Sequence, residues 1–244
     1  MLEKSIGIIG GVGPAAGLAL MRAVHQFAKP ANDQAYPNVI LASFGAQIPD
    51  RTGYLLGEHN QNPAGPIASV LNALGAAGAS VVGIPCNTAH SPKIWSKICT
   101  HLDENGHRPE LVNMVASTFN EVLQVGNVQR VGVLATSGSV NSNVFGIYGR
   151  RLGFEVVYPT PSQQATLHDA IYDPEYGIKS TVEQYTDRCI ADCAEVGRQL
   201  LPDVDCLLIG CTELSLIPKS TFAELSYPAF HSLDALAKQL LKGL

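Results

Sequence analysis

The chain has 244 residues, of which 46% are hydrophobic and 15% are charged, and its formal net charge at pH 7 is -5. This composition excludes a disordered or fibrous protein, and the length suffices to bury one large core or two modest ones. Nucleic acid and anionic membranes are excluded as partners, because the sequence lacks the clustered Lys and Arg that phosphate binding needs. A small-molecule function is therefore favoured.

The first apolar run, at residues 5–9, is interrupted by a glycine-rich turn at 10–13. It fits neither a membrane span nor a signal peptide, so we expect a cytoplasmic protein. In that compartment the six cysteines should be reduced. Cys189 and Cys193 lack further ligands at zinc-site spacing, so we expect no metal.

Apolar runs of strand length alternate with helical stretches along the whole chain. The predicted strands lie within residues 5–10, 38–46, 79–87, 111–116, 129–135, 153–159, 204–210 and 227–230. The predicted helices lie within residues 14–28, 62–78, 88–106, 118–124, 163–201 and 233–241, and a Ser/Thr cap is expected at the start of the helices within 118–124 and 233–241. This alternation predicts parallel sheets with helices on both faces.

The two halves of the chain share a register. Gly7 and Gly132, each inside an apolar strand, are 125 positions apart, and Cys86 and Cys211 have the same separation. A duplicated α/β unit explains both spacings. Because ligands of open α/β sheets bind at the carboxyl ends of the strands, we expect Cys86 and Cys211 to face each other across a cleft.

We therefore predict an α/β protein with two pseudo-symmetric Rossmann-like lobes, each a mostly parallel sheet flanked by helices, and an active site between them. The first lobe would contain residues 1–115, joined by a C-terminal segment at 229–244. The second would contain residues 116–228.

The two cysteines have similar surroundings. Cys86 ends an apolar strand and precedes polar residues at a helix start, where unpaired N–H groups favour a thiolate. Cys211 precedes Thr212 and Glu213 in the same way. A buried, inert thiol is the alternative for each. Two opposed thiols can remove a proton from one face of a carbon and return one to the other face, which is racemisation or epimerisation.

Several segments could bind anions. Gly11 and Gly13 formally match a dinucleotide fingerprint, but the following strand lacks the acidic end that a ribose needs, so we interpret the turn as a carboxylate site. A simple tight turn is the alternative. Arg51 and Lys179 could each pair with a carboxylate, or be ordinary solvated cations. His90 is interpreted as a support for the turn at Cys86 and not as a base.

The segments GGVGP, IPDRT, PCNTAH, LATSGS and GCTELSL together resemble the aspartate/glutamate racemase superfamily, in particular its aspartate racemase branch. The resemblance implies a cofactor-independent racemase of aspartate or glutamate, commonly a homodimer, with Cys86 and Cys211 as the acid–base pair. The substrate-binding residues that it implies are Gly11, Gly13, Arg51, Asn87, Thr88, Thr136, Ser137, Lys179, Thr212 and Glu213. Val12 and Gly17 depart from the usual pattern, which leaves the substrate open.

Three alternatives remain at this stage. Related folds decarboxylate malonates or isomerise maleate, and a non-catalytic binding protein could use the same cleft. A nucleotide-dependent dehydrogenase is the last alternative.

Overall fold

The computed structural model describes residues 4–103, 109–181, 185–225 and 227–244. It contains two four-stranded parallel sheets. The first has the order β2-β1-β3-β4, with β1 (Ser5–Gly10), β2 (Asn38–Ser43), β3 (Val81–Gly83) and β4 (Glu110–Val112). The second has the order β6-β5-β7-β8, with β5 (Arg130–Leu134), β6 (Glu155–Val157), β7 (Cys206–Ile209) and β8 (Ala229–His231). The predicted fold class is confirmed.

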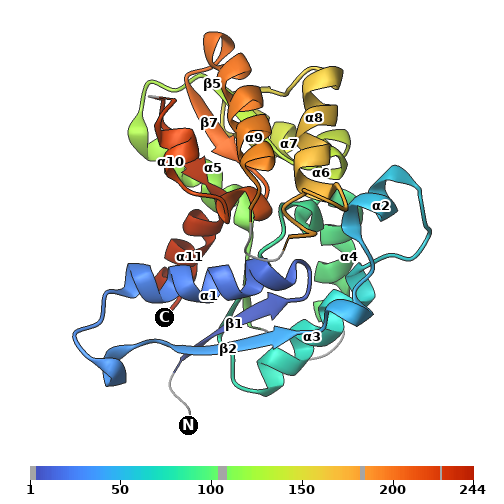
Figure 1. Ribbon diagram of the computed structural model, residues 1–244. Helices are drawn as coiled ribbons and strands as arrows, with labels where there is room; N and C mark the ends of the chain where they lie inside the picture. Colours follow the sequence, from blue (N-terminus) through green and yellow to red (C-terminus); the bar gives the residue numbers. More distant parts are fainter. Residues whose placement is uncertain (1–3, 104–108, 182–184, 226) are drawn as a thin grey trace.

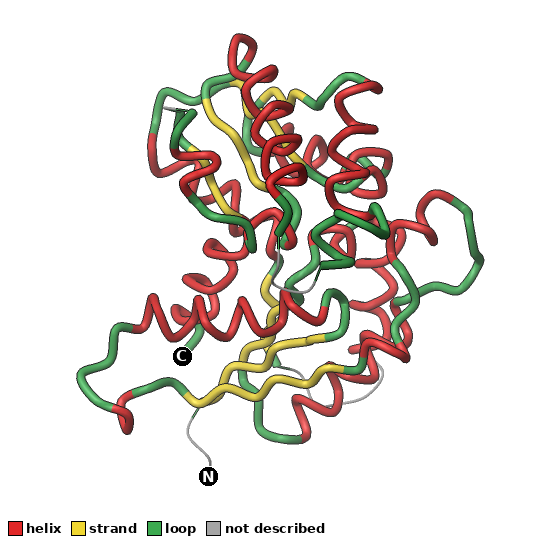
Figure 2. Tube along the Cα trace, in the orientation of Figure 1, coloured by secondary structure: helices red, strands yellow, loops and turns green. Residues whose placement is uncertain are grey.

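Helices flank both sheets, one sheet lying in the upper and one in the lower part of the view (Figures 1 and 2). The α-helices are α1 (Pro14–Ala28), α2 (Arg51–Leu56), α3 (Ala64–Ala76), α4 (Pro92–Asp103), α5 (Met114–Val125), α6 (Ser137–Asn141), α7 (Val144–Arg151), α8 (Pro161–Tyr172), α9 (Asp187–Leu200), α10 (Ser220–Ala223) and α11 (Ser232–Lys242). Short 3₁₀ helices span Asp33–Ala35, Gly45–Gln47, Asn87–His90, Leu201–Asp203 and Glu213–Ser215. Among the described residues, none of the helices has the length and apolar character needed to cross a membrane.

The strand pairing repeats the register found in the sequence. Gly7 of β1 lies opposite Val82 of β3, and Gly132 of β5 lies opposite Leu207 of β7. Val82 and Leu207 are also 125 positions apart. The same pair of central strands therefore forms in each sheet, and each pair delivers a cysteine turn to the carboxyl edge of its sheet.

Two helices pack away from the sheet that precedes them in the chain. Phe119 and Val122 of α5, which follows β4, pack in one cluster with Val131 and Val133 of β5. Residues of α11, which follows β8, instead share a cluster with β1 in the first sheet: Leu233, Leu236 and Leu240 pack there with Ile6 and Ile8. These contacts join the two halves, and the division of the chain at residue 115 stays a prediction.

The structure differs from the predicted elements in four places. The predicted helix within 88–106 begins only at Pro92, after a 3₁₀ turn, because proline suits the first helical turn. The cap of α11 is His231, whose side chain makes no cap hydrogen bond, and not a Ser or Thr. The cap of α5 is Asn113, whose side chain accepts a hydrogen bond from the backbone N–H of Ala116, and not a Ser or Thr. Helix α2 was not expected; Asp50 caps it by accepting from the Gly53 N–H.

Candidate active site

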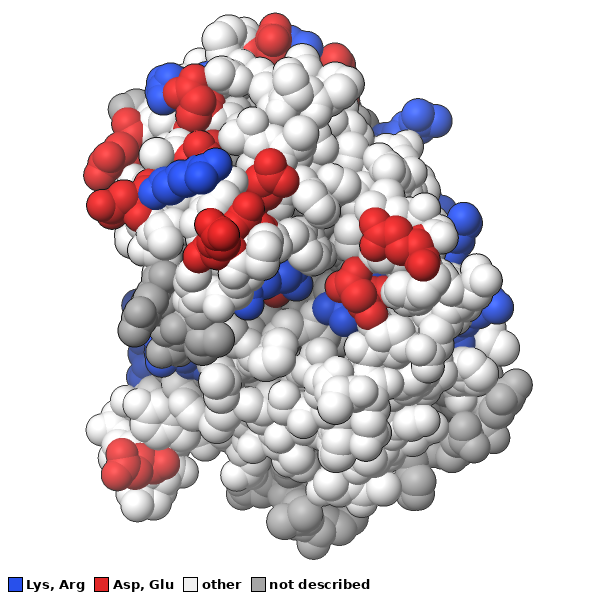
Figure 3. All heavy atoms as spheres, turned by 45° about the vertical axis from the view of Figure 1, so that its right-hand side comes forward, with Lys and Arg blue, Asp and Glu red and all other residues white. Residues whose placement is uncertain are grey.

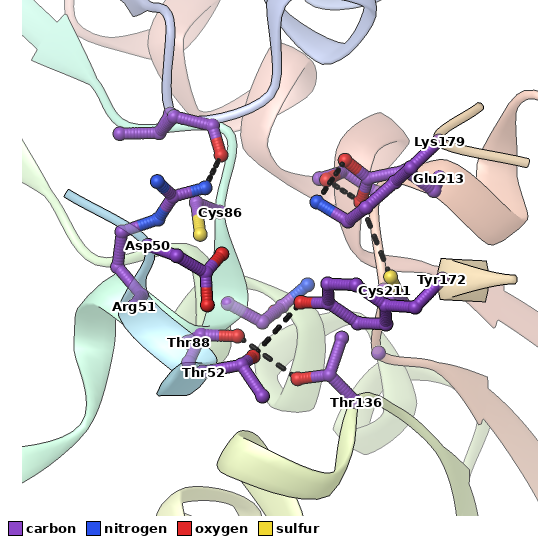
Figure 4. Close-up of a pocket in the computed structure, with 14 residues that line it drawn as sticks. Asp50, Arg51, Thr52, Cys86, Thr88, Thr136, Tyr172, Lys179, Cys211 and Glu213 are labelled. Carbon is purple, nitrogen blue, oxygen red and sulfur yellow. Dashed lines mark hydrogen bonds and ion pairs between the residues drawn. The ribbon is translucent and has the colours of Figure 1, made fainter. Parts of the chain in front are cut away.

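A pocket lies between the two sheets, and segments from both halves line it (Figure 4). Space-filling atoms show acidic and basic side chains around a hollow between the upper and lower parts (Figure 3). Nine of the predicted site residues line the pocket: Arg51, Cys86, Asn87, Thr88, Thr136, Lys179, Cys211, Thr212 and Glu213. Those from the first half follow β2 and β3, and those from the second follow β5, β7 and α8. The duplicated fold thus brings both cysteine turns to one pocket.

Gly11, Gly13 and Ser137 are not part of the pocket wall. Gly11 has a φ of 81°, and a Cβ there would lie 2.5 Å from the backbone nitrogen of Gly45, so packing of the turn requires a glycine. A Cβ on Gly13 would lie 2.7 Å from the Glu213 carboxylate. The hydroxyl of Ser137 lies 3.3 Å from Nδ1 of His168. A substrate contact for these three residues stays a prediction.

Thr52, whose hydroxyl the sequence offers as a donor beside Arg51, also lines the pocket. Four further lining residues were not suggested by the sequence: Val12, Asp50, Tyr172 and Gly210. Three of these, Val12, Asp50 and Gly210, are next in the chain to a residue that was suggested, so the neighbours of the suggested residues could have been considered as well. Tyr172 has no such signal. Its side chain reaches a partner 120 positions away, the hydroxyl of Thr52.

Cys86 lies next to the guanidinium of Arg51. Arg51 is buried and donates from Nη1 to the Pro49 carbonyl at 3.1 Å and from Nη2 to the Val12 carbonyl. Burial lowers the pKa of Arg51, but its electrostatic interactions with Cys86 and Asp50 outweigh burial and raise it. The guanidinium therefore stays charged, and a cation in this position stabilises negative charge on the Cys86 sulfur.

Cys211 lies in a network with a carboxylate and an ammonium group. Its Sγ donates to Oε2 of Glu213 at 3.2 Å, the Thr212 hydroxyl donates to the same oxygen at 3.0 Å, and Nζ of Lys179 lies 3.0 Å from Oε1. Burial and the Glu213 charge raise the pKa of Cys211 well above its usual range, against the opposing charge of Lys179. At neutral pH Cys211 is thus a thiol.

The ion pair beside Cys211 is charged despite its burial. Burial by itself raises the pKa of Glu213, but the charge and hydrogen bond of Lys179 outweigh it, and the pKa falls to about 2. Burial likewise lowers the pKa of Lys179, but Glu213 reverses the shift and raises it. The pocket therefore holds one cation near each sulfur, and the cation near Cys211 forms an ion pair with a carboxylate.

Hydroxyl groups connect the two halves at the base of the pocket. The Thr88 hydroxyl lies 3.0 Å from that of Thr136 and 2.9 Å from that of Ser139, and the last two are 3.1 Å apart. Nearby, Nδ2 of Asn87 donates to the Ser232 hydroxyl at 2.8 Å. Oδ1 of Asn87 is a buried acceptor with no hydrogen-bond partner among the described residues, so it is free to accept from a ligand.

His90 supports the Cys86 turn, as the sequence suggested. Its Nε2 accepts from the Met114 N–H at 3.2 Å, so Nδ1 carries the proton and donates to the Cys86 carbonyl at 2.9 Å. Burial lowers the pKa of His90 to about 4, against the hydrogen bond to the Cys86 carbonyl. The imidazole is neutral and holds the turn in place.

This burial predicts a pH dependence of stability. Between pH 6.5 and pH 4 the unfolded chain binds a proton at His90 that the folded chain does not, so stability falls as the pH decreases, by up to about 1.4 kcal/mol per pH unit. Urea unfolding of the wild type and of His90→Gln at pH 7 and pH 5 measures this. The wild type should lose more stability over the interval than the variant, and equal losses would contradict the assignment.

The close contact between α2 and α6 predicts a second effect on the stability of the protein. A Cβ on Gly138 would lie 2.9 Å from Cα of Thr52, whereas a Cβ on Gly45 would meet atoms only at 3.7 Å. Gly138→Ala should therefore lower the free energy of unfolding by about 1–3 kcal/mol, as in other overpacked sites. Gly45→Ala is the matched control and should change stability much less; equal effects in urea unfolding would argue against the contact.

Among the described residues, no group of three His, Cys, Asp or Glu side chains is arranged to hold a metal ion.

A family model described as Asp/Glu/Hydantoin racemase matches residues 9–240 of the chain. Among solved structures, the aspartate racemase of Picrophilus torridus is similar at 26% identity and a TM-score of 0.80, with 98% of this chain and 94% of that chain covered. An aspartate racemase homologue from Pyrococcus horikoshii OT3 is 20% identical with a TM-score of 0.70, and 98% of each chain is covered. Glutamate racemase from Francisella tularensis, solved in complex with D-glutamate, is 17% identical with a TM-score of 0.64, covering 98% of this chain and 80% of that one. Because the family match extends over nearly the whole sequence, the chain belongs to the Asp/Glu/hydantoin racemase family.

Proposed function

We propose that the protein is a cofactor-independent racemase of an acidic amino acid, aspartate or glutamate, with Cys86 and Cys211 as opposed acid and base. The observation that carries the proposal is that the two cysteines, one from each half, line a single pocket with Arg51 beside one and Lys179 near the other. Similarity to the aspartate racemase of Picrophilus torridus supports it.

The reaction begins with different roles for the two sulfurs. Cys211 is a thiol and acts as the acid, and Cys86, beside the Arg51 guanidinium, acts as the base. The Cys86 thiolate takes the Cα proton of one substrate hand, so that the C–H bond breaks, an S–H bond forms and the electron pair remains on the substrate carbon next to its carboxylate. The Cys211 thiol then delivers its proton to the opposite face.

The surroundings support this transfer. A Cα proton of an amino acid is a weak acid, so the negative charge that develops on the substrate must be stabilised by preorganised donors. The donors that line the pocket are the cations of Arg51 and Lys179 and the hydroxyls of Thr88 and Thr136. After one turnover the two sulfurs have exchanged roles, and the substrate of the other hand reacts in reverse.

The experiment is incubation of L-aspartate and L-glutamate in deuterated water. Racemisation through two thiols gives the D-amino acid with deuterium at Cα, detected by NMR and chiral chromatography. No D-product and no deuterium from either amino acid would contradict the proposal. The homodimer and the cytoplasmic location stay predictions.

A further inference from the structure

The pocket is nearly filled by its own side chains. The free space between them is about 10 Å³, room for about one water molecule. Any amino acid can therefore enter only if part of the wall moves. Most of the wall is held firmly: Arg51 donates to two backbone carbonyls, and Glu213 receives three polar partners.

Tyr172 is the largest side chain in the wall with a weaker attachment. It is the last residue of α8, and its hydroxyl donates to Oγ1 of Thr52, on α2, at 2.9 Å. Its ring stacks on His168 with 4.7 Å between ring centroids. If the two halves separate to admit a ligand, the hydrogen bond from Tyr172 to Thr52 breaks. It can form again around the ligand only if the ligand does not occupy the position of the phenol ring.

The phenol reaches from the side of Lys179 towards the segment that carries Arg51, and its hydroxyl points at Thr52 (Figure 4). Thr52 adjoins Arg51 in the chain, and Nζ of Lys179 lies 5.0 Å from the centroid of the Tyr172 ring. Burial raises the pKa of Tyr172, against the Lys179 charge, so the phenol is neutral and remains a donor to Thr52. A ligand with a carboxylate at each cation must pass beside this ring.

We infer that Tyr172 is a specificity-determining residue that limits the length of the acidic substrate, so that the site favours a four-carbon over a five-carbon dicarboxylic amino acid. This inference rests on the proposed function, because it assigns the two carboxylates to Arg51 and Lys179. An additional methylene has to displace the ring of Tyr172 from the wall of the pocket. One methylene typically changes discrimination by about 10- to 200-fold.

The test uses succinate and glutarate, which carry the two carboxylates without a reactive amino acid centre, and measures binding by calorimetry. Wild type should bind succinate at least about tenfold more tightly than glutarate. Tyr172→Leu removes the ring and should reduce the preference to below about threefold. Tyr172→Phe keeps the ring and should preserve the preference. No preference in wild type, or an unchanged preference in Tyr172→Leu, overturns the inference.

A control variant separates this effect from general damage. Tyr158 also has a hydrogen-bonded phenol, which donates to Oδ1 of Asn143, but it does not line the pocket. Tyr158→Leu should keep the wild-type preference for succinate.

Racemisation assays on L-aspartate and L-glutamate distinguish the two proposals. If wild type racemises aspartate but Tyr172→Leu leaves the ratio of kcat/KM values unchanged, the specificity inference fails and the proposed function stands. If wild type racemises neither amino acid but shows a Tyr172-dependent preference for succinate, the proposed function fails and the size limit stands.

Discussion

Replacing either Cys86 or Cys211 by serine is expected to lower the racemisation rate by about 10²–10⁴-fold, the usual contribution of a positioned acid or base. Serine nearly preserves the shape of the side chain, but its hydroxyl is a far weaker acid than a thiol. Each cysteine handles the proton on one face only, so the other cannot replace it. Chiral chromatography of aspartate and glutamate incubated with each variant measures the loss.

The two variants should differ in the hand of substrate that they still exchange. Cys211→Ser retains the Cys86 base, so it should exchange the Cα proton of the hand whose proton faces Cys86. Cys86→Ser retains only Cys211, a thiol at neutral pH, so it should exchange the opposite hand much more slowly. NMR in deuterated water, run separately on the L and D forms, follows this exchange. Cys99→Ser is the control, because Cys99 lies on α4 and not in the pocket wall, and it should racemise normally. Full activity in Cys211→Ser would refute the two-thiol mechanism.

The cysteine turns could be predicted because local sequence determines them. Each strand before a cysteine is a short apolar run, and β3 and β7 are indeed buried. The common offset of 125 residues then places the two turns equivalently in the two sheets, where Gly7 and Gly132 have equivalent partners. Strand pairing of this kind follows from patterns within one half of the chain. It can be predicted without knowing how the two sheets pack against each other.

Contacts between the halves could not be predicted in this way. The hydrogen bond from Tyr172 to Thr52 and the hydroxyl cluster of Thr88, Thr136 and Ser139 depend on how the halves pack against each other. No periodicity or spacing encodes that packing. The packing of α11 against the first sheet could not be predicted either, because an apolar helix face can pack against many partners.

Replacing Glu213 by glutamine is expected to destabilise the protein strongly at neutral pH. Glutamine keeps the size of the side chain but leaves the Lys179 ammonium without its counter-charge, and breaking a buried ion pair on one side costs about 3–5 kcal/mol. The pKa of Cys211 should fall as well, because the neighbouring negative charge that raises it is gone and Lys179 remains. Cys211 would then ionise more readily before the substrate reacts, so less of it would be present as the thiol that donates the proton, and the rate of racemisation should fall together with stability.

The pH dependence identifies the charge as the cause. The pKa of Glu213 is about 2 in the folded protein and near 4.5 in the unfolded chain, so its carboxylate stabilises the fold fully above pH 4.5 and this contribution is lost as the pH falls towards 2. The shift corresponds to about 3 kcal/mol. Urea unfolding should therefore show a difference between wild type and Glu213→Gln that is constant above pH 4.5 and shrinks below it.

A double-mutant cycle completes the test of the ion pair. Lys179→Met alone leaves the Glu213 carboxylate buried and unpaired, so it should also be strongly destabilising. The combination with Glu213→Gln removes both charges and should be less destabilising than the sum of the two single variants, with a coupling of about 0.5–3 kcal/mol. Additive effects would mean that Glu213 and Lys179 do not stabilise each other. The raised pKa of Cys211 could then not be explained by a Glu213 carboxylate that Lys179 holds in place.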